Sequence, residues 1–268
     1  MLKNKLAVVG AVILLLLIVS AIFAPQLAPY NPLEQKVIEG LNPPSAAHWF
    51  GQDKLGRDIF SRMMYGSRIS IWVGLATVSI SLIIGVTIGA ISGYYGGFID
   101  ELFMRIVDIL MAFPGILLAI AMVAVLGPGL NHVILALCLI GWVGYARLVR
   151  GQVLFLRELD YVTAARALGA KPARIIAVHL IPNLLAPVIV EATFGMAGAI
   201  LAEASLSFLG LGAQPPTPSW GAMLNDGRDY LLFAPHHTTF PGLVIMLVVL
   251  GFNFVGDGLR DYFDVKRM

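Results

Sequence analysis

Long runs of apolar residues are the feature that most constrains the fold of this chain. The sequence contains six of them, and a transmembrane helix requires about 20 apolar residues. The bilayer interior holds no water to hydrogen-bond an open backbone, so such runs cross it as helices that satisfy their own N–H and C=O groups. We therefore predict an all-α polytopic membrane protein with about six transmembrane helices, at residues 6–24, 70–93, 102–126, 131–150, 186–210 and 238–257.

The composition agrees with this class and excludes others. Of the residues, 58% are hydrophobic and 13% are charged, whereas an ordinary soluble domain has about 25% charged residues. The formal net charge of +2 is too small for a nucleic-acid-binding surface. Cys138 is the only cysteine, so an internal disulfide and a cysteine-based metal site are both impossible. We expect no bound metal and no nucleic-acid partner.

Basic residues in the loops set the expected orientation. Lys and Arg gather between residues 147 and 174, which places this connection in the cytoplasm by the positive-inside rule. With six spans, both termini are then cytoplasmic. Five basic residues near the termini agree with this: Lys3, Lys5, Arg260, Lys266 and Arg267. Five in the first external segment argue against it: Lys36, Lys54, Arg57, Arg62 and Arg68.

A polar connection at residues 151–185 predicts a short helix that ends at a glycine. Asp160 would cap its N-terminus, because an aspartate side chain accepts hydrogen bonds from the first free N–H groups of a helix. Gly169 would end it with a positive φ, which glycine adopts without steric cost. The face presented to a partner would carry three apolar residues: Val162, Ala165 and Leu168.

A second helix is expected directly after this turn. Pro172 suits its first turn, where the missing N–H would have had no intrahelical partner. Pro182 is expected to end it before the chain returns to the membrane. Two short helices outside the bilayer can transmit movement between a membrane domain and a protein beneath it.

This connection resembles the cytoplasmic coupling loop, the EAA motif, of permease subunits in bacterial ATP-binding-cassette (ABC) importers. The small-residue core of the motif corresponds to Thr163, Ala164 and Ala165, followed by Gly169 and Pro182. The family usually has a Glu, which contacts the ATPase, where this chain has Thr163. Other stretches are similar to the second membrane subunit of dipeptide, oligopeptide and nickel importers: HWFGQDKLGRDIFSRMMYGSRIS at 48–70, FPG at 113–115, EASLSFLGLG at 203–212, PPTPSWGAML at 215–224 and VGDGLRD at 255–261.

The resemblance implies a permease of the type I importer kind, which forms half of a translocation pathway for dipeptides or oligopeptides in the bacterial cytoplasmic (inner) membrane. Its implied partners are a homologous permease, giving a heterodimer, two ATPase subunits and an external substrate-binding protein. ATP and magnesium would bind to the ATPase subunits, and no cofactor is expected on this chain. The residues implied in ATPase coupling are Asp160, Thr163, Ala164, Ala165, Leu168, Gly169 and Pro182. Nickel chelates stay open as an alternative cargo.

The chain is expected to have two parts and no enzymatic activity. Residues 1–68 would hold an N-terminal span and an external segment, and residues 69–268 the core permease with its coupling loop. A phosphate-binding loop, G-x-x-x-x-G-K-[ST], is absent from the sequence, where no lysine is followed by serine or threonine. ATP hydrolysis must then come from another polypeptide.

Three residues within the predicted spans are candidates for the pathway. Glu203 lies deep in the fifth span with Ser207 one turn later, so the two share a helix face. Because a lipid-facing carboxylate is unfavourable, Glu203 either lines a hydrophilic pathway or hydrogen-bonds within the helix packing. Pro114 bends the third span and frees a carbonyl, which fits either a moving, cavity-lining segment or a static kink.

Two proline-rich external stretches, residues 25–68 and 211–236, carry Trp49 and Trp220. The resemblance implies that this surface docks the binding protein, with the two tryptophans as candidate contacts. Tryptophan is as common as an anchor at the membrane interface, and that alternative stays open.

Two other classes of membrane protein also stay open. An autonomous secondary transporter would need no coupling loop, and it would often carry ion-binding carboxylates near unwound segments, where Glu203 is the only candidate. A membrane scaffold or receptor would leave both Glu203 and the polar connection without a role.

Overall fold

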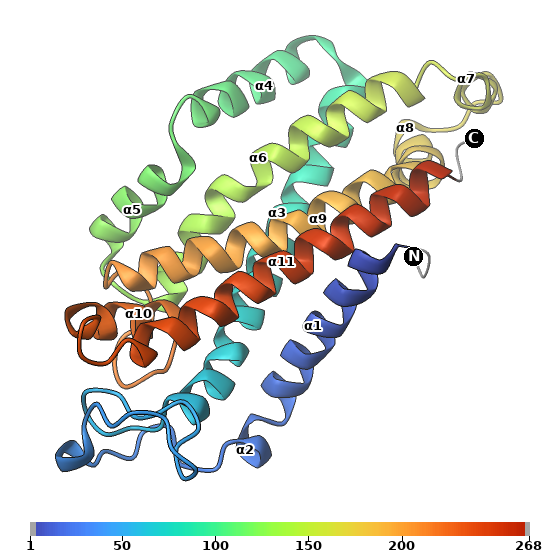
Figure 1. The fold of residues 1–268 in the computed structure, drawn as a ribbon. Coiled ribbons are helices and arrows are strands. Elements are labelled where there is room, and N and C mark those ends of the chain that lie inside the picture. Colours follow the sequence, from blue (N-terminus) through green and yellow to red (C-terminus); the bar gives the residue numbers. More distant parts are fainter. Residues whose placement is uncertain (1–3, 266–268) are drawn as a thin grey trace.

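The computed structural model describes residues 4–265, which form a helical bundle (Figure 1). The long helices are α1 (Lys5–Ile22), α3 (Ile59–Tyr95), α6 (Leu130–Leu156), α9 (Ile181–Phe208) and α11 (His236–Val265). The shorter elements are α2 (Ala24–Leu27), η1 (Val37–Glu39), α4 (Gly97–Met111), α5 (Gly115–Leu126), α7 (Asp160–Ala167), α8 (Pro172–Arg174), the π-helical segment η2 (Ile175–Leu180), α10 (Trp220–Gly227) and η3 (Arg228–Tyr230). Over the described residues the predicted all-α class is confirmed, since no strand is present there.

Five helices are long and apolar enough to cross a membrane, or six if the bent pair of α4 and α5 counts as one span. The second span begins earlier than the expected residue 70, because Asp58 caps α3 by accepting a hydrogen bond from Ser61 N at 2.7 Å. The expected division between residues 68 and 69 therefore falls inside a continuous helix.

The third predicted span, residues 102–126, is two helices instead of one. The axes of α4 and α5 differ by 86°, and the break lies at residues 112–114. Pro114 is the N-cap of α5 and cannot donate a backbone hydrogen bond to α4. With 12 residues, α5 is about 18 Å long and too short to cross a hydrocarbon core of about 30 Å by itself.

A stripe of glycines brings α3 and α6 into close contact. Gly85, Gly89 and Gly93 are four residues apart and so lie on one face of α3. A Cβ atom at Gly89 would lie 2.5 Å from the carbonyl oxygen of Ala146, and one at Gly85 would lie 2.7 Å from that of Trp142. Small residues at such spacing let two membrane helices pack backbone to backbone.

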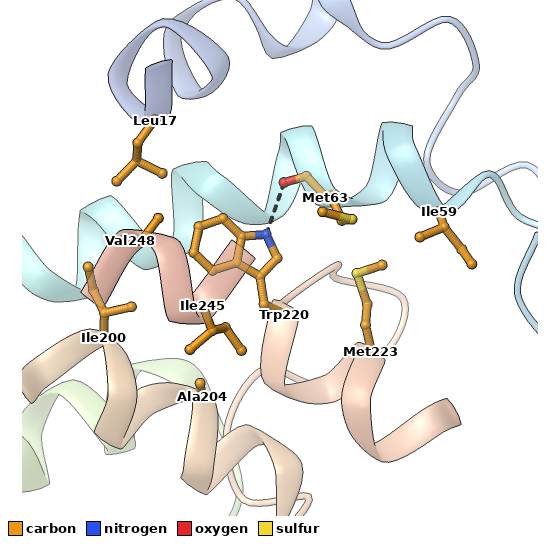
Figure 2. Close-up of a cluster of buried hydrophobic side chains, with 9 residues drawn as sticks. All are labelled: Leu17, Ile59, Met63, Ile200, Ala204, Trp220, Met223, Ile245 and Val248. Carbon is orange, nitrogen blue, oxygen red and sulfur yellow. Dashed lines mark hydrogen bonds between the residues drawn. The ribbon is translucent and has the colours of Figure 1, made fainter. Parts of the chain in front are cut away.

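Trp220 lies at the centre of a core cluster that joins α1, α3, α9, α10 and α11 (Figure 2). Its side chain is 1% exposed, and the indole Nε1 donates a hydrogen bond to the carbonyl oxygen of Met63 at 3.0 Å. The expectation that Trp220 contacts a binding protein or the membrane interface is therefore wrong. The indole fills the space between helices that are far apart in the sequence, which a local pattern does not reveal.

Candidate functional site

The helix α7 projects at the end of the bundle where both ends of the described chain lie (Figure 1). Gly169 follows it with a φ of +81°, which confirms the predicted positive φ. Asp160 is not the N-cap as predicted. Leu159 takes that position, and its carbonyl oxygen accepts hydrogen bonds from Val162 N at 3.0 Å and Thr163 N at 3.1 Å. Asp160 instead adds negative charge to the first turn, which suits the positive end of the helix dipole.

The exposed face of α7 differs from the predicted one. Val162 is fully buried against Val153 and Ile175, so it anchors α7 to the membrane domain and is unavailable to a partner. Leu168 is 89% exposed. The residues on the outer side, some of them beyond the predicted set, are Tyr161, Thr163, Ala164, Ala167 and Leu168.

The second helix begins at Pro172 as predicted, but Pro182 does not end it. Residues 172–208 form one continuous helical run through α8, η2 and α9. The π-helical turn accommodates the proline, since Ile181 N donates to the carbonyl oxygen of Ile176, five residues back, and Pro182 then falls in the first turn of α9. A displacement of α8 is therefore passed directly to the long helix α9.

Glu203 is fully buried and bonded to its neighbour one turn later. Ser207 Oγ donates to Glu203 Oε1 at 2.6 Å, and the same hydroxyl accepts a hydrogen bond from Ala213 N at 3.1 Å. Neither residue lines the two cavities described below. This geometry favours the packing alternative, in which Glu203 and Ser207 hold the turn after α9 against the bundle.

Residues of four helices, α3, α5, α6 and α9, line a partly open cavity of about 290 Å³, which we call the central cavity. Its polar lining comes from Thr77 and Ser81 of α3, Tyr145 of α6 and Glu191 of α9, and the first residue of α5, Gly115, directly follows Pro114. A second cavity, of about 350 Å³, is also lined by Glu191, together with Gln152 and Arg260 near the α7 end of the bundle. Sequence reasoning missed both cavities, although four glycines in the wall of the first were a signal: Gly141, Gly144, Gly195 and Gly198.

The segment between α2 and α3 is held by a buried charge cluster, which we call the Asp53 cluster: Asp53, Arg57, Arg62 and Asp226. Asp53 Oδ2 lies 2.6 Å from Arg57 Nε and 3.5 Å from Arg62 Nε, and Arg57 also reaches Asp226 at 3.5 Å. Four of the five basic residues that argued against the expected orientation are thus paired with carboxylates, since Lys54 also lies 2.6 Å from Asp226 and Lys36 lies 4.0 Å from Glu34.

Trp49, a candidate contact from the sequence, and the ion pair of Asp108 both lie on the surface of the chain. Trp49 is 58% exposed and makes an edge contact with Phe60, with ring centroids 5.0 Å apart, so its role remains a prediction. At the other end of the bundle, Asp108 of α4 pairs with Arg147 of α6. That ion pair ties the amphipathic helix α4 to the membrane domain.

A bundle of membrane helices with a cavity, a broken helix beside it and a short projecting helix at one end is the arrangement expected of a membrane transport subunit. The chain belongs to the family of binding-protein-dependent transport system inner membrane components, whose sequence profile matches residues 85–267. Residues 1–44 also match the N-terminal transmembrane domain of oligopeptide transport permease C. The predicted class, a permease subunit of an ABC importer, is confirmed.

Similar proteins include three peptide permeases. The dipeptide transport system permease protein DppC of Alkalihalophilus pseudofirmus is 53% identical over 98% of this chain and 87% of its own length. The oligopeptide permease OppC of Bacillus subtilis is 47% identical over 98% and 87% of the two chains. The glutathione permease GsiD of Escherichia coli is 49% identical over 98% and 88%.

A solved structure shows the same fold. A chain of the MetNI methionine ABC transporter, in an inward-facing conformation, aligns with a TM-score of 0.57 at 22% sequence identity. The alignment covers 75% of this chain and 95% of that chain. At this identity the likeness shows the fold alone.

Proposed function

We propose that this chain forms half of a translocation pathway for dipeptides and short oligopeptides. The observation that carries the proposal is the identity of 47% to 53% to permeases named for dipeptide, oligopeptide and glutathione transport, all of them peptides. Nickel import is not favoured by these relatives, and the described residues contain no group of three or more metal-ligating side chains. An autonomous secondary transporter is not favoured either, because the family is that of binding-protein-dependent transport systems.

The partners of the chain follow from its family and from its exposed surfaces. An ABC importer requires ATPase subunits and a substrate-binding protein. We infer that two ATPase chains, which hold the ATP and magnesium, serve the pair of permeases, and that one of them binds the exposed face of α7. The second half of the pathway would come from a homologous permease. The backbone break at residues 112–114 is exposed on this chain, and an irregular backbone at membrane depth must face protein or water. We place the partner permease or the pathway at this break.

The proposed orientation puts the α7 end of the bundle in the cytoplasm, in the bacterial inner membrane. Asn4 Nδ2 donates to Asp261 Oδ2 at 2.9 Å, which holds the two ends of the described chain together at that end. Three of the basic residues that supported this orientation, Lys3, Lys266 and Arg267, lie outside the described residues.

Reconstitution tests the proposed function. Liposomes are prepared with this chain, its partner permease, the ATPase subunits and the binding protein. They are expected to accumulate radiolabelled alanyl-alanine only when ATP is present on the side of the membrane that carries the ATPase subunits. The purified chain alone is expected neither to bind nor to hydrolyse ATP, because it lacks a phosphate-binding loop. ATP-driven uptake of nickel chelates without uptake of any peptide would contradict the proposal.

Gly169→Val is expected to uncouple transport from ATP hydrolysis. A positive φ costs an ordinary residue about 1–2 kcal/mol, and a β-branched side chain crowds the turn further, so the variant should reorient α7 instead of unfolding the bundle. Uptake should fall about tenfold, while the chain inserts normally and ATPase docking weakens or hydrolysis continues without uptake.

The matched control for this variant is Gly127→Val. Gly127 has a φ of +92° and, like Gly169, has no atom within 4 Å of an added Cβ, but it lies at the far end of α5. Both variants carry the same kind of backbone strain, and only Gly169→Val should reduce ATPase association. Equal effects of the two variants, or wild-type uptake by Gly169→Val, would mean that α7 is an ordinary connection.

A further inference from the structure

The central cavity lies beside the middle part of three helices that are candidates to span the membrane. Ser81 is near the middle of α3, Gly141 is near the middle of α6, and Gly198 lies in the second half of α9. The three helices are each long enough to cross a membrane. A solute that crosses the bilayer along this chain must pass this depth.

One wall of the cavity offers hydrogen-bond donors. The helix α5 begins at Gly115, and its first internal bond is donated by Leu117 N to the carbonyl oxygen of Pro114 at 3.0 Å. The N–H groups of Gly115 and Ile116 therefore have no intrahelical acceptor, and the start of a helix carries about half a positive charge. Both residues line the cavity.

A buried hydroxyl on the neighbouring helix adds to this wall. Ser81 is 1% exposed, and its Oγ has no hydrogen-bond partner among the described residues. It lines the cavity beside Gly141, where an added Cβ would lie 2.5 Å from that Oγ. A buried polar group without a partner is unfavourable, so a polar group that enters the cavity beside Ser81 would gain a hydrogen bond to this hydroxyl.

The other wall carries a carboxylate. Glu191 of α9 lines the central cavity and also the second cavity, which continues toward the α7 end with Gln152 and Arg260. It lies close enough to the Tyr145 hydroxyl for the two groups to interact electrostatically. Glu191 is therefore the one side chain shared by both described cavities, at the point where a solute would leave the first for the second.

The rest of the cavity lining does not discriminate between the side chains of different peptides. It consists largely of glycines and apolar residues, among them Val78, Leu137, Gly144, Gly195, Ala199 and Ala202. A volume of about 290 Å³ lies at the small end of ligand cavities, which span roughly 300–1,000 Å³. The cavity suits a small zwitterion whose side chains vary.

We propose that this cavity binds the main chain of a dipeptide in transit. The free carboxylate accepts hydrogen bonds from the start of α5 and from Ser81 Oγ, and the α-ammonium group donates to the Glu191 carboxylate. This inference rests on the proposed peptide transport and adds the residues that recognise the two ends of the cargo. Glu191 then receives the ammonium group as the peptide moves toward the second cavity.

Equilibrium dialysis against the assembled transporter tests the proposal. The complex is nucleotide-free and lacks the binding protein, and the probes are radiolabelled alanyl-alanine, its N-acetyl derivative and its C-terminal amide. Glu191→Gln is expected to weaken binding of alanyl-alanine about tenfold, as for loss of a charge-assisted hydrogen bond, and to leave the N-acetyl derivative unchanged. Ser81→Ala is expected to weaken binding of alanyl-alanine severalfold and to leave binding of its C-terminal amide unchanged.

Matched controls separate recognition from structure. Ser92→Ala removes another buried, unpartnered hydroxyl of α3 that does not line either cavity, and Glu101→Gln removes an exposed carboxylate of α4. Both controls should bind all three probes as the wild type does. If Glu191→Gln fails to assemble, Glu191→Asp keeps the charge and should retain the preference for the free amine.

Two results would overturn the inference. One is an equal loss of affinity for all three probes in Glu191→Gln and in Ser81→Ala. The other is the absence of saturable alanyl-alanine binding by the wild-type complex. Uptake by the wild-type liposomes is measured beside these experiments. Normal peptide uptake with either overturning result removes only this cavity assignment, whereas absent peptide uptake removes the proposed function.

Discussion

Gly89→Leu is expected to prevent stable folding of the chain, while Gly151→Leu leaves it folded. An added Cβ at Gly89 would lie 2.5 Å from the carbonyl oxygen of Ala146 and 3.1 Å from Arg150 N. Both atoms belong to the backbone of α6, so no side-chain rotation can relieve the contact. Overpacking a close contact typically costs about 1–3 kcal/mol, and a leucine that forces two helices apart should cost more.

The measurement is the amount of monodisperse chain after detergent extraction, together with the midpoint of its thermal transition. Gly151 lies on α6 with no atom within 4 Å of an added Cβ, so it reports the effect of a leucine on a helix without the close contact. Gly89→Ala should lower the midpoint by less than Gly89→Leu. A wild-type midpoint for Gly89→Leu would show that α3 and α6 need not approach so closely.

The sequence predicted the parts of this fold that depend on local patterns. Apolar runs of about 20 residues give helices in any membrane protein, because the bilayer leaves the backbone no alternative. Gly169 was likewise predictable, since a glycine after a short helix that must reverse direction commonly takes a positive φ. In both cases the physical cause lies within a few residues of the feature.

The errors occurred where a distant part of the chain decides the outcome. Val162 is apolar in a polar helix and could face either way, and only the position of η2 shows that it points inward. Trp220 was assigned to a surface because its loop is rich in proline, but five helices enclose it. Asp160 is not the N-cap of α7, because the extended residue before it, Leu159, supplies the carbonyl oxygen that accepts the first hydrogen bonds of the helix.

The break in the third span was partly visible in the sequence. The run at residues 102–126 includes Arg105 and Asp108, two charges that fit a helix at the membrane surface better than a span. Pro114 follows them and begins the apolar helix α5. Its position beside a central cavity was not predictable, because that cavity forms only when α3, α6 and α9 pack together.

The continuous helix of residues 172–208 connects the two functional ends of the chain. Its first turns contact α7, where an ATPase subunit is proposed to bind, and its middle carries Glu191 at the wall of both cavities. A movement of α7 can therefore reach Glu191 along one continuous helical run. This arrangement would let ATP binding change the shape of the proposed peptide site.

Asp53→Asn is expected to destabilise the segment between α2 and α3 by about 3–5 kcal/mol. The Asp53 side chain is 1% exposed, and the side chains of Arg57 and Arg62 are 5% and 3% exposed. Asp53 is the carboxylate that pairs with both guanidinium groups. Asparagine keeps the shape and can still accept hydrogen bonds from Leu55 N and Arg57 N, so the change removes mainly the charge. Arg57 would then keep only its longer ion pair with Asp226, whose side chain is 28% exposed, and Arg62 would lose its carboxylate partner.

Arg62 Nη1 also donates to the carbonyl oxygen of Pro32 at 3.2 Å and so fixes the start of the segment. Protease added outside intact cells therefore measures the loosening of this segment. Cleavage within residues 28–58 should become at least tenfold faster in Asp53→Asn. Asp229→Asn is the control, since its ion pair with Arg228 has side chains 74% and 59% exposed and exposed pairs contribute about 0–1 kcal/mol. Adding Arg62→Met to Asp53→Asn should recover part of the resistance to protease, because it removes the buried guanidinium group that has lost its carboxylate partner. Unchanged cleavage in Asp53→Asn would show that hydrogen bonds to the backbone, and not the buried charges, hold this segment in place.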